Sequence, residues 1–169
     1  EIDSDSFEPQ FELVEITQFL TDIKEIMTPA ISEKGLTLET RFSSGNLLVQ
    51  TDKSRLHHVL INILTNAIKY TDEGEIVLGY KAVYFRRKLG IEIIIRDTGK
   101  GVSEEFKNRM FQEFSHDEDY SEINPTNTGL GMVIVKRIIE KLGGEILFES
   151  TPNSGSEFFV RLPLRMQKI

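Results

Sequence analysis

Apolar residues recur along this chain at two spacings, and these spacings predict helices and strands in a definite order. Apolar positions three and four residues apart predict helices over 11–34, 52–70 and 130–142, and a short helix fits 103–110. Short alternating or continuous apolar runs predict strands over 36–42, 47–51, 75–85, 91–97, 145–151 and 156–164. Short turns between the later strands favour antiparallel pairing. The order predicts an α/β two-layer sandwich, with a mixed, mostly antiparallel sheet and about three helices on one face.

Two stretches lack such periodicity. Residues 1–10 are acidic and contain a proline, so they are expected to form a linker or frayed end before a single domain over 11–169. Residues 112–128 are polar and acidic, with Pro125, and are predicted to form a mobile loop. Pro29 is expected to kink or shorten the first helix.

Composition narrows the class of protein. The 169 residues are 39% hydrophobic and 28% charged, which is ordinary for a globular domain, and they contain no cysteine. A net charge of -7 argues against nucleic-acid binding, which needs a basic surface. Three histidines argue against a dedicated zinc site. The chain begins with Glu1 rather than methionine, so we expect a fragment of a longer protein. It has no apolar run of the ~18 residues that suggest a membrane span.

A polar stripe interrupts the predicted helix 52–70. Asn62, Asn66 and Lys69 follow one another at helical spacing, although asparagine is poor in helix interiors. An amide oxygen can bind Mg²⁺, and a lysine one turn away suits a phosphate oxygen. A solvated helix face explains the same residues, so the pattern alone leaves both interpretations open.

Two glycine motifs could approach a ligand. Asp97 ends an apolar strand and is followed by Gly99 and Gly101, while Gly129 and Gly131 come at the start of the last predicted helix. Backbone N–H groups at a helix start favour an anion. An ordinary turn and an ordinary helix start remain the alternatives. Neither motif has the spacing of a P-loop or of a dinucleotide-binding fingerprint.

Taken in order, these stretches resemble the sequence boxes of the sensor histidine kinases. "DKSRLHHVLINILTNAIKYT" resembles the N box, "DTGKGV" the G1 box, "FQEF" the F box and "TGLGM" the G2 box. The similarity extends over about residues 7–165 and includes the closing hairpin "PNSGSEFFVRLP". The resemblance implies the catalytic, ATP-binding domain of a two-component kinase, which has the Bergerat (GHKL) fold and a mobile ATP lid over about 103–128.

The resemblance also implies roles for individual residues. Asn66 would be the main Mg²⁺ ligand and Asn62 would assist it, Lys69 and Tyr70 would contact phosphate and nucleotide, and Asp97 would accept a hydrogen bond from the adenine amino group. Phe111 and Phe114 would anchor the lid. The residues implied in nucleotide binding are Asn62, Asn66, Lys69, Tyr70, Asp97, Gly99, Gly101, Val102, Phe114, Thr128, Gly129, Leu130, Gly131 and Met132. Of these, Asn62, Asn66 and Lys69 are the implied catalytic residues.

Asn62 is informative about the reaction. Hydrolytic relatives carry a glutamate there that activates water, and an amide cannot act as that base. The resemblance therefore implies an ATP-dependent protein-histidine kinase domain that phosphorylates a histidine on a separate dimerisation domain. His57 and His58 lie inside the N box and do not resemble the phosphoacceptor. The acidic lid and Met132, where leucine is more usual, depart from the family pattern.

Two other functions stay open at this point: a nucleotide-sensing or docking module without catalysis, and a hydrolytic ATPase of the same fold. The implied partners are the parent's own dimerisation and phosphoacceptor domain, which this chain does not contain, and the receiver domain of a response regulator. The parent is expected to be a homodimer. We expect a cytoplasmic location for this domain, in a parent that could be an inner-membrane sensor, and no binding to nucleic acid.

Overall fold

The computed structural model describes residues 7–43, 45, 47–111 and 130–164. The strands are β1 (Glu12–Glu15), β2 (Thr37–Phe42), β3 (Leu48–Thr51), β4 (Glu75–Phe85), β5 (Lys88–Asp97), β6 (Glu145–Thr151) and β7 (Gly155–Pro163). The helices are α1 (Ile16–Glu33), α2 (Lys53–Tyr70), α3 (Glu104–Arg109) and α5 (Leu130–Lys141). The predicted order of elements is therefore observed, with one strand added at the start.

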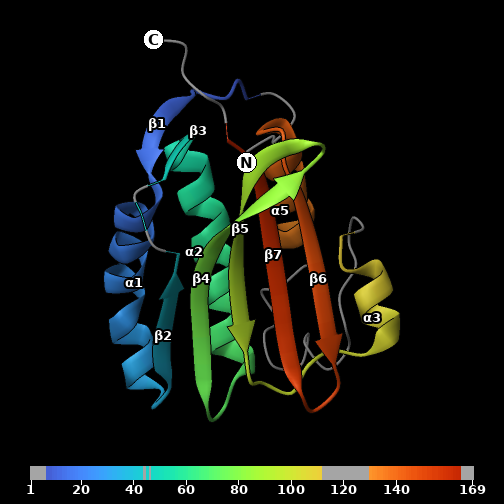
Figure 1. Cartoon of the computed structure of the whole chain (residues 1–169). Helices are drawn as coiled ribbons and strands as arrows, with labels where there is room; N and C mark the ends of the chain where they lie inside the picture. Colours follow the sequence, from blue (N-terminus) through green and yellow to red (C-terminus); the bar gives the residue numbers. More distant parts are fainter. Residues whose placement is uncertain (1–6, 44, 46, 112–129, 165–169) are drawn as a thin grey trace.

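The main sheet has five strands in the order β2-β4-β5-β7-β6. Only the β2–β4 pair is parallel, and the other three neighbouring pairs are antiparallel. Figure 1 shows α1, α2 and α5 along one face of this sheet, while α3 lies beside β6. The predicted two-layer α/β sandwich with a mixed, mostly antiparallel sheet is confirmed.

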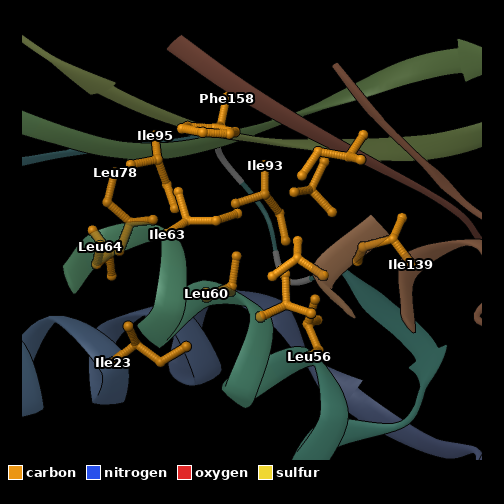
Figure 2. Close-up of a cluster of buried hydrophobic side chains, with 14 of the residues drawn as sticks. Ile23, Leu56, Leu60, Ile63, Leu64, Leu78, Ile93, Ile95, Ile139 and Phe158 are labelled. Carbon is orange, nitrogen blue, oxygen red and sulfur yellow. The ribbon is translucent and has the colours of Figure 1, made fainter. Parts of the chain in front are cut away.

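The core lies between the sheet and α2. Leu56, Leu60 and Ile63 are fully buried on one side of α2, at the helical spacing seen in the sequence. They face the inner side of the sheet, where Ile95 lies opposite Phe158 (Figure 2). Because the strands alternate inward and outward residues, the same register decides which side chains stand beside α2 at the end of the sheet.

The first predicted helix begins later than its apolar pattern suggested. Residues Glu12–Glu15 form β1, which pairs antiparallel with β3 in a separate two-stranded sheet. Helix α1 then starts at Ile16 because the Glu15 carboxylate accepts hydrogen bonds from Thr17 N–H (3.0 Å) and Gln18 N–H (2.8 Å). Pro29 lies inside α1, which continues to Glu33, so of the two expected effects, a kink or a shorter helix, the structure excludes the shorter helix.

Residues 7–10 form neither helix nor strand, yet they contact the domain. Phe7 is buried, with the Arg55 guanidinium 4.4 Å from its ring centroid and Lys141 Nζ at 4.9 Å. Lys141 also donates a hydrogen bond to the Phe7 carbonyl at 2.9 Å, and Gln10 N–H donates to Asp52 at 3.0 Å. This segment therefore touches both the start of α2 and the end of α5.

Among the described helices, none is both long enough and apolar enough to cross a membrane.

Candidate functional site

Helix α2 carries the polar stripe predicted from the sequence. Its first turn is capped by Asp52, whose side chain accepts a hydrogen bond from Arg55 N–H at 3.1 Å. Asn62 and Asn66 are both half-buried, so neither lies on a fully solvated helix face. The alternative of a fully solvated stripe therefore does not describe Asn62 and Asn66, whereas Lys69 is exposed.

The stripe faces the beginning of α5. Asn66 donates from Nδ2 to Sδ of Met132 at 3.6 Å, and Met132 is buried. Asn62 lies one turn before Asn66 on α2, and a Cβ atom at Gly131 would lie 3.4 Å from its Nδ2 and 3.7 Å from its Oδ1. Asn62 and Asn66 of the N box therefore lie beside Gly131 and Met132 of the G2 box, although the two boxes are more than sixty positions apart in the sequence.

The C-terminal turn of α2 ends beside the glycine motif that follows β5. Lys69 is exposed and Tyr70 is half-buried. Lys34 Nζ donates to the carbonyl oxygens of Ile68 and Lys69, which a helix end leaves without intrahelical partners. A Cβ atom at Gly99 would lie only 2.4 Å from the Tyr70 carbonyl oxygen, so this close approach requires glycine.

Asp97 is the last residue of β5 and its side chain is buried. It lies on the helix-facing side of the sheet together with Ile95, because residues two positions apart in a strand point to the same face. Its Oδ1 accepts a hydrogen bond from Gly99 N–H at 2.9 Å. One carboxylate oxygen is therefore held by the turn that follows the strand.

Burial raises the pKa of Asp97, because the charged carboxylate loses water contacts. The backbone N–H groups of Gly99 and Ser156 and the nearby Thr71 hydroxyl favour the charged carboxylate and offset part of this rise in pKa. Thr71 is itself fully buried, and its Oγ1 makes no well-formed hydrogen bond within the described residues, although it stands close to Asp97. A buried carboxylate beside an unpartnered hydroxyl is suited to a polar ligand group.

The glycines of the G1 motif also serve the fold. Gly101 has φ +70, and a Cβ atom there would lie 2.3 Å from the Thr151 carbonyl oxygen. Val102, which follows it, is buried, and its N–H donates to Ser150 Oγ at 2.9 Å. Gly99 and Gly101 were expected to let a nucleotide lie against the strand end. In the structure, the atoms nearest to a Cβ position at these glycines are the carbonyl oxygens of Tyr70 and Thr151.

Sequence reasoning missed four residues around Asp97: Thr71, Ser150, Gly155 and Ser156. A Cβ atom at Gly155, which has φ +96, would lie 2.1 Å from the Asp97 carbonyl oxygen. The alternation of "EILFES" places Ser150 on the same face as Ile146 and Phe148, and that pattern could have revealed its inward position.

Three of the predicted site residues, Phe114, Thr128 and Gly129, lie outside the described residues, as do residues 112–129 of the expected lid. Leu130 is the first residue of α5. At the other end of this stretch, Ser103 caps α3, and its hydroxyl accepts from Phe106 N–H at 3.1 Å. Phe111 packs against the core, with Lys136 Nζ 5.8 Å from its ring centroid.

The side chains at this site that could bind a metal ion are the amides of Asn62 and Asn66. Within the described part of the chain, no group of three or more His, Cys, Asp or Glu residues is placed to hold a metal ion. Because Nδ2 of Asn66 donates to Met132, its Oδ1 is the acceptor end of that side chain. Mg²⁺ is commonly bound by few protein ligands together with substrate phosphates, which fits one or two amide oxygens. The arrangement can therefore present amide oxygens to a cation and a buried carboxylate to an amino group.

Comparison with known proteins gives the same family along most of the chain. The family model described as "Histidine kinase-, DNA gyrase B-, and HSP90-like ATPase" matches residues 51–166. The sensor protein GacS of Pseudomonas syringae pv. syringae is 38% identical over 153 residues, which are 88% of this chain and 17% of GacS. The signal transduction histidine-protein kinase BarA of Escherichia coli (strain K12) is 34% identical over 149 residues, 86% of this chain and 16% of BarA.

Solved structures agree with this grouping. Full-length ShkA in complex with AMPPNP superposes with a TM-score of 0.80 and 27% sequence identity, over 97% of this chain and 33% of ShkA. A nucleotide-free catalytic domain of the histidine kinase ThkA gives a TM-score of 0.75 at 24% identity, over 92% of this chain and 96% of that domain, and so supports the fold. This chain thus corresponds to a domain of its longer relatives.

Proposed function

Because the chain belongs to the histidine kinase-, DNA gyrase B- and HSP90-like ATPases, and its relatives are sensor histidine kinases, we propose that it binds MgATP and donates the γ-phosphoryl group to a histidine of a separate dimerisation domain. The observation that carries this proposal is the meeting of Asn62 and Asn66 with Gly131 and Met132 at the start of α5. It brings amide oxygens to a helix start, where an anion is favoured.

The adenine would bind beside Asp97. Its buried carboxylate accepts from Gly99 N–H through Oδ1, and its remaining lone pairs could accept a hydrogen bond from the exocyclic amino group. Tyr70 and Val102 flank the same turn and would contact the nucleotide. A buried polar acceptor discriminates strongly against a base that lacks the matching donor, because the acceptor would otherwise stay unpaired.

The phosphates would lie toward α5. Asn66 and Asn62 would hold Mg²⁺, which neutralises charge on the phosphates when it is bound. Lys69, exposed in the last turn of α2, would contact a phosphate oxygen. The N–H groups of Gly129, Leu130 and Gly131 would bind phosphate as well, with Thr128 beside them, and Phe114 would anchor the lid.

The identity of residue 62 favours transfer over hydrolysis. An amide can orient a ligand but cannot take a proton from water, so the bound nucleotide would persist until a histidine nucleophile reaches it. The nucleophile would come from the parent's dimerisation domain, with a receiver domain acting downstream and the parent acting as a homodimer in the cytoplasm. GacS and BarA are sensor kinases of which this chain matches 17% and 16%, which supports such a division of labour.

A direct test combines binding and transfer. Isothermal titration of the chain with ADP or a non-hydrolysable ATP analogue in Mg²⁺ should show binding at or below millimolar concentration. Mixing the chain with the phosphoacceptor domain of its parent and labelled ATP should give acid-labile phosphohistidine on that domain. The absence of nucleotide binding would exclude the proposal. Binding without transfer would instead favour the nucleotide-sensing module, and steady phosphate release would favour a hydrolytic ATPase.

A further inference from the structure

The last cross-strand pair on the helix-facing side of the β6–β7 hairpin is polar. Ser150 lies opposite Ser156, and Ser156 lies opposite Asp97 in the neighbouring strand pair. The preceding pair on this face is Phe148 and Phe158, whose ring centroids are 4.6 Å apart. The inner row of the sheet thus changes from aromatic to hydroxyl side chains where the carboxylate of Asp97 is placed.

Ser150 uses all the hydrogen-bonding capacity of its hydroxyl. Its Oγ accepts from Val102 N–H at 2.9 Å and lies 3.0 Å from the Gly155 carbonyl oxygen and 3.0 Å from Ser156 Oγ. A hydroxyl has a single proton to donate, and a carbonyl can only accept. Ser150 therefore donates to Gly155, and the Ser156 hydroxyl donates to Ser150.

These three bonds connect the segments on both sides of Asp97. Val102 ends the turn that follows Asp97, and a Cβ atom at Gly101 in that turn would lie 3.1 Å from Ser150 Oγ. Gly155 lies on the other side, so close to Asp97 that a Cβ atom would stand 2.1 Å from the Asp97 carbonyl oxygen. One hydroxyl thus joins the turn, the start of β7 and the end of β6.

We infer that Ser150 is a positioning residue for the nucleobase site: by binding Val102 N–H and the Gly155 carbonyl, it fixes the turn after β5 relative to Asp97. This inference rests on the proposed function, because it takes the ligand beside Asp97 to be a purine nucleotide. Ser150 does not touch that ligand. It holds the backbone whose N–H groups orient the carboxylate.

A purely structural role for Ser150 predicts a different result. Replacing Ser150 with alanine removes only the hydroxyl oxygen and leaves the buried N–H of Val102 without a partner. If the hydroxyl merely stabilised the hairpin, the melting temperature would fall while nucleotide affinity and base preference stayed the same. If it positions the turn, the backbone at Val102 becomes free to move and base recognition changes.

The first experiment uses the ligand-free chain. Amide hydrogen exchange, read by NMR, should show Val102 N–H exchanging at least about tenfold faster in Ser150→Ala than in the wild type, since the hydroxyl that accepts from it is gone. Amides in the middle of the β4–β5 pair should keep their protection. Ser150→Thr, which retains the hydroxyl, and Ser154→Ala, which changes an exposed serine in the same hairpin, should match the wild type. Unchanged exchange at Val102 in Ser150→Ala would overturn the inference.

The second experiment measures ADP and GDP affinity by calorimetry at a temperature where every variant is folded. Ser150→Ala should bind ADP about tenfold more weakly and should prefer ADP over GDP less than the wild type does, while Ser150→Thr should restore both. Equal ADP affinity in Ser150→Ala and the wild type would overturn the inference. Failure of the wild type to bind either nucleotide would overturn the proposed function instead, and the exchange result on the ligand-free chain would still decide whether Ser150 positions the turn.

Discussion

Asn66 donates from Nδ2 to Sδ of Met132 at 3.6 Å, and this bond joins the middle of α2 to the first turn of α5. It fixes which end of the Asn66 amide is the acceptor and links the helix that carries the proposed metal ligands to the helix start that we propose binds phosphate. The consequences of this placement can be tested residue by residue.

Asn66→Ala should abolish Mg²⁺-dependent nucleotide binding and histidine phosphorylation without unfolding the chain, because a half-buried amide is removed from α2 and alanine is a good helix former. Titration with ADP in the presence and absence of Mg²⁺ measures the metal-dependent part of the affinity. Asn108→Ala, an exposed asparagine in α3, is the matched control and should bind like the wild type. Wild-type affinity in Asn66→Ala would show that this amide is not a ligand.

Asp97→Asn should weaken ADP binding at pH 7 by at least about tenfold, because an amide N–H would face the adenine amino group. Asp72→Asn changes a carboxylate whose side chain is 92% exposed, and it should leave the affinity unchanged. Calorimetry of the two variants provides the comparison, and equal affinities would remove Asp97 from the site.

The stability of the wild type relative to Asp97→Asn should depend on pH. Burial raises the pKa of Asp97 in the folded chain above its ordinary 3.8, so the folded state holds this proton more tightly than the unfolded state. The contribution of Asp97 to the free energy of unfolding is therefore fully present below pH 3.8 and is lost as pH rises through the raised pKa. Urea unfolding of both proteins across acidic pH should show the wild type gaining relative stability as pH falls, and the reverse slope would contradict the assignment.

Asn62→Asp should raise phosphate release in the absence of an acceptor histidine by about tenfold or more, because a carboxylate of the same size can serve as a base for water. A longer glutamate is a poorer test, since Asn62 already lies within 3.4 Å of a Cβ position at Gly131. Asn62→Ala, which supplies no base, is the control in a coupled phosphate assay. If Asn62→Asp releases phosphate no faster than Asn62→Ala, water activation at this position is excluded.

Gly155→Ala should destabilise the domain more than Gly45→Ala, although both glycines have φ +96. Among the described residues, none lies within 4 Å of a Cβ atom at Gly45, so alanine there should cost only about 1–2 kcal/mol of backbone strain. Alanine at Gly155 meets the Asp97 carbonyl and should cost a further 1–3 kcal/mol, roughly, from overpacking. Denaturant unfolding measures both, and similar losses would mean that the close approach to Asp97 is readily relieved.

Phe7→Ala should lower the free energy of unfolding by about 3 kcal/mol through the loss of buried aromatic area. Phe7→Leu should cost less than about 1.5 kcal/mol, because it keeps the burial and loses the contacts of Arg55 and Lys141 with the ring. Ile26→Ala, at a side chain that is 57% exposed, provides the control. A neutral Phe7→Ala would mean that residues 7–10 contribute nothing to the domain.

The features that local sequence revealed are those that repeat within one element. The spacing of Leu56, Leu60 and Ile63 predicted α2 and its buried side, and the same spacing placed Asn62 and Asn66 together. Features that depend on distant segments were not predictable in this way. Strand β1 forms because it pairs with β3, and the tight fit of Gly155 against Asp97 follows from the register of β5 and β7. Burial of Phe7 likewise depends on α5, far along the chain.

The contact between Phe7 and Lys141 has a consequence for the order in which the chain folds, because it joins residues 134 positions apart. Closing so long a loop costs entropy that is regained only when many intervening contacts exist. The surroundings of Phe7 are therefore complete only when α2 and α5 are both in place, because its ring contacts Arg55 and Lys141. During synthesis on the ribosome, the contact with Lys141 cannot form before the end of α5 has been made.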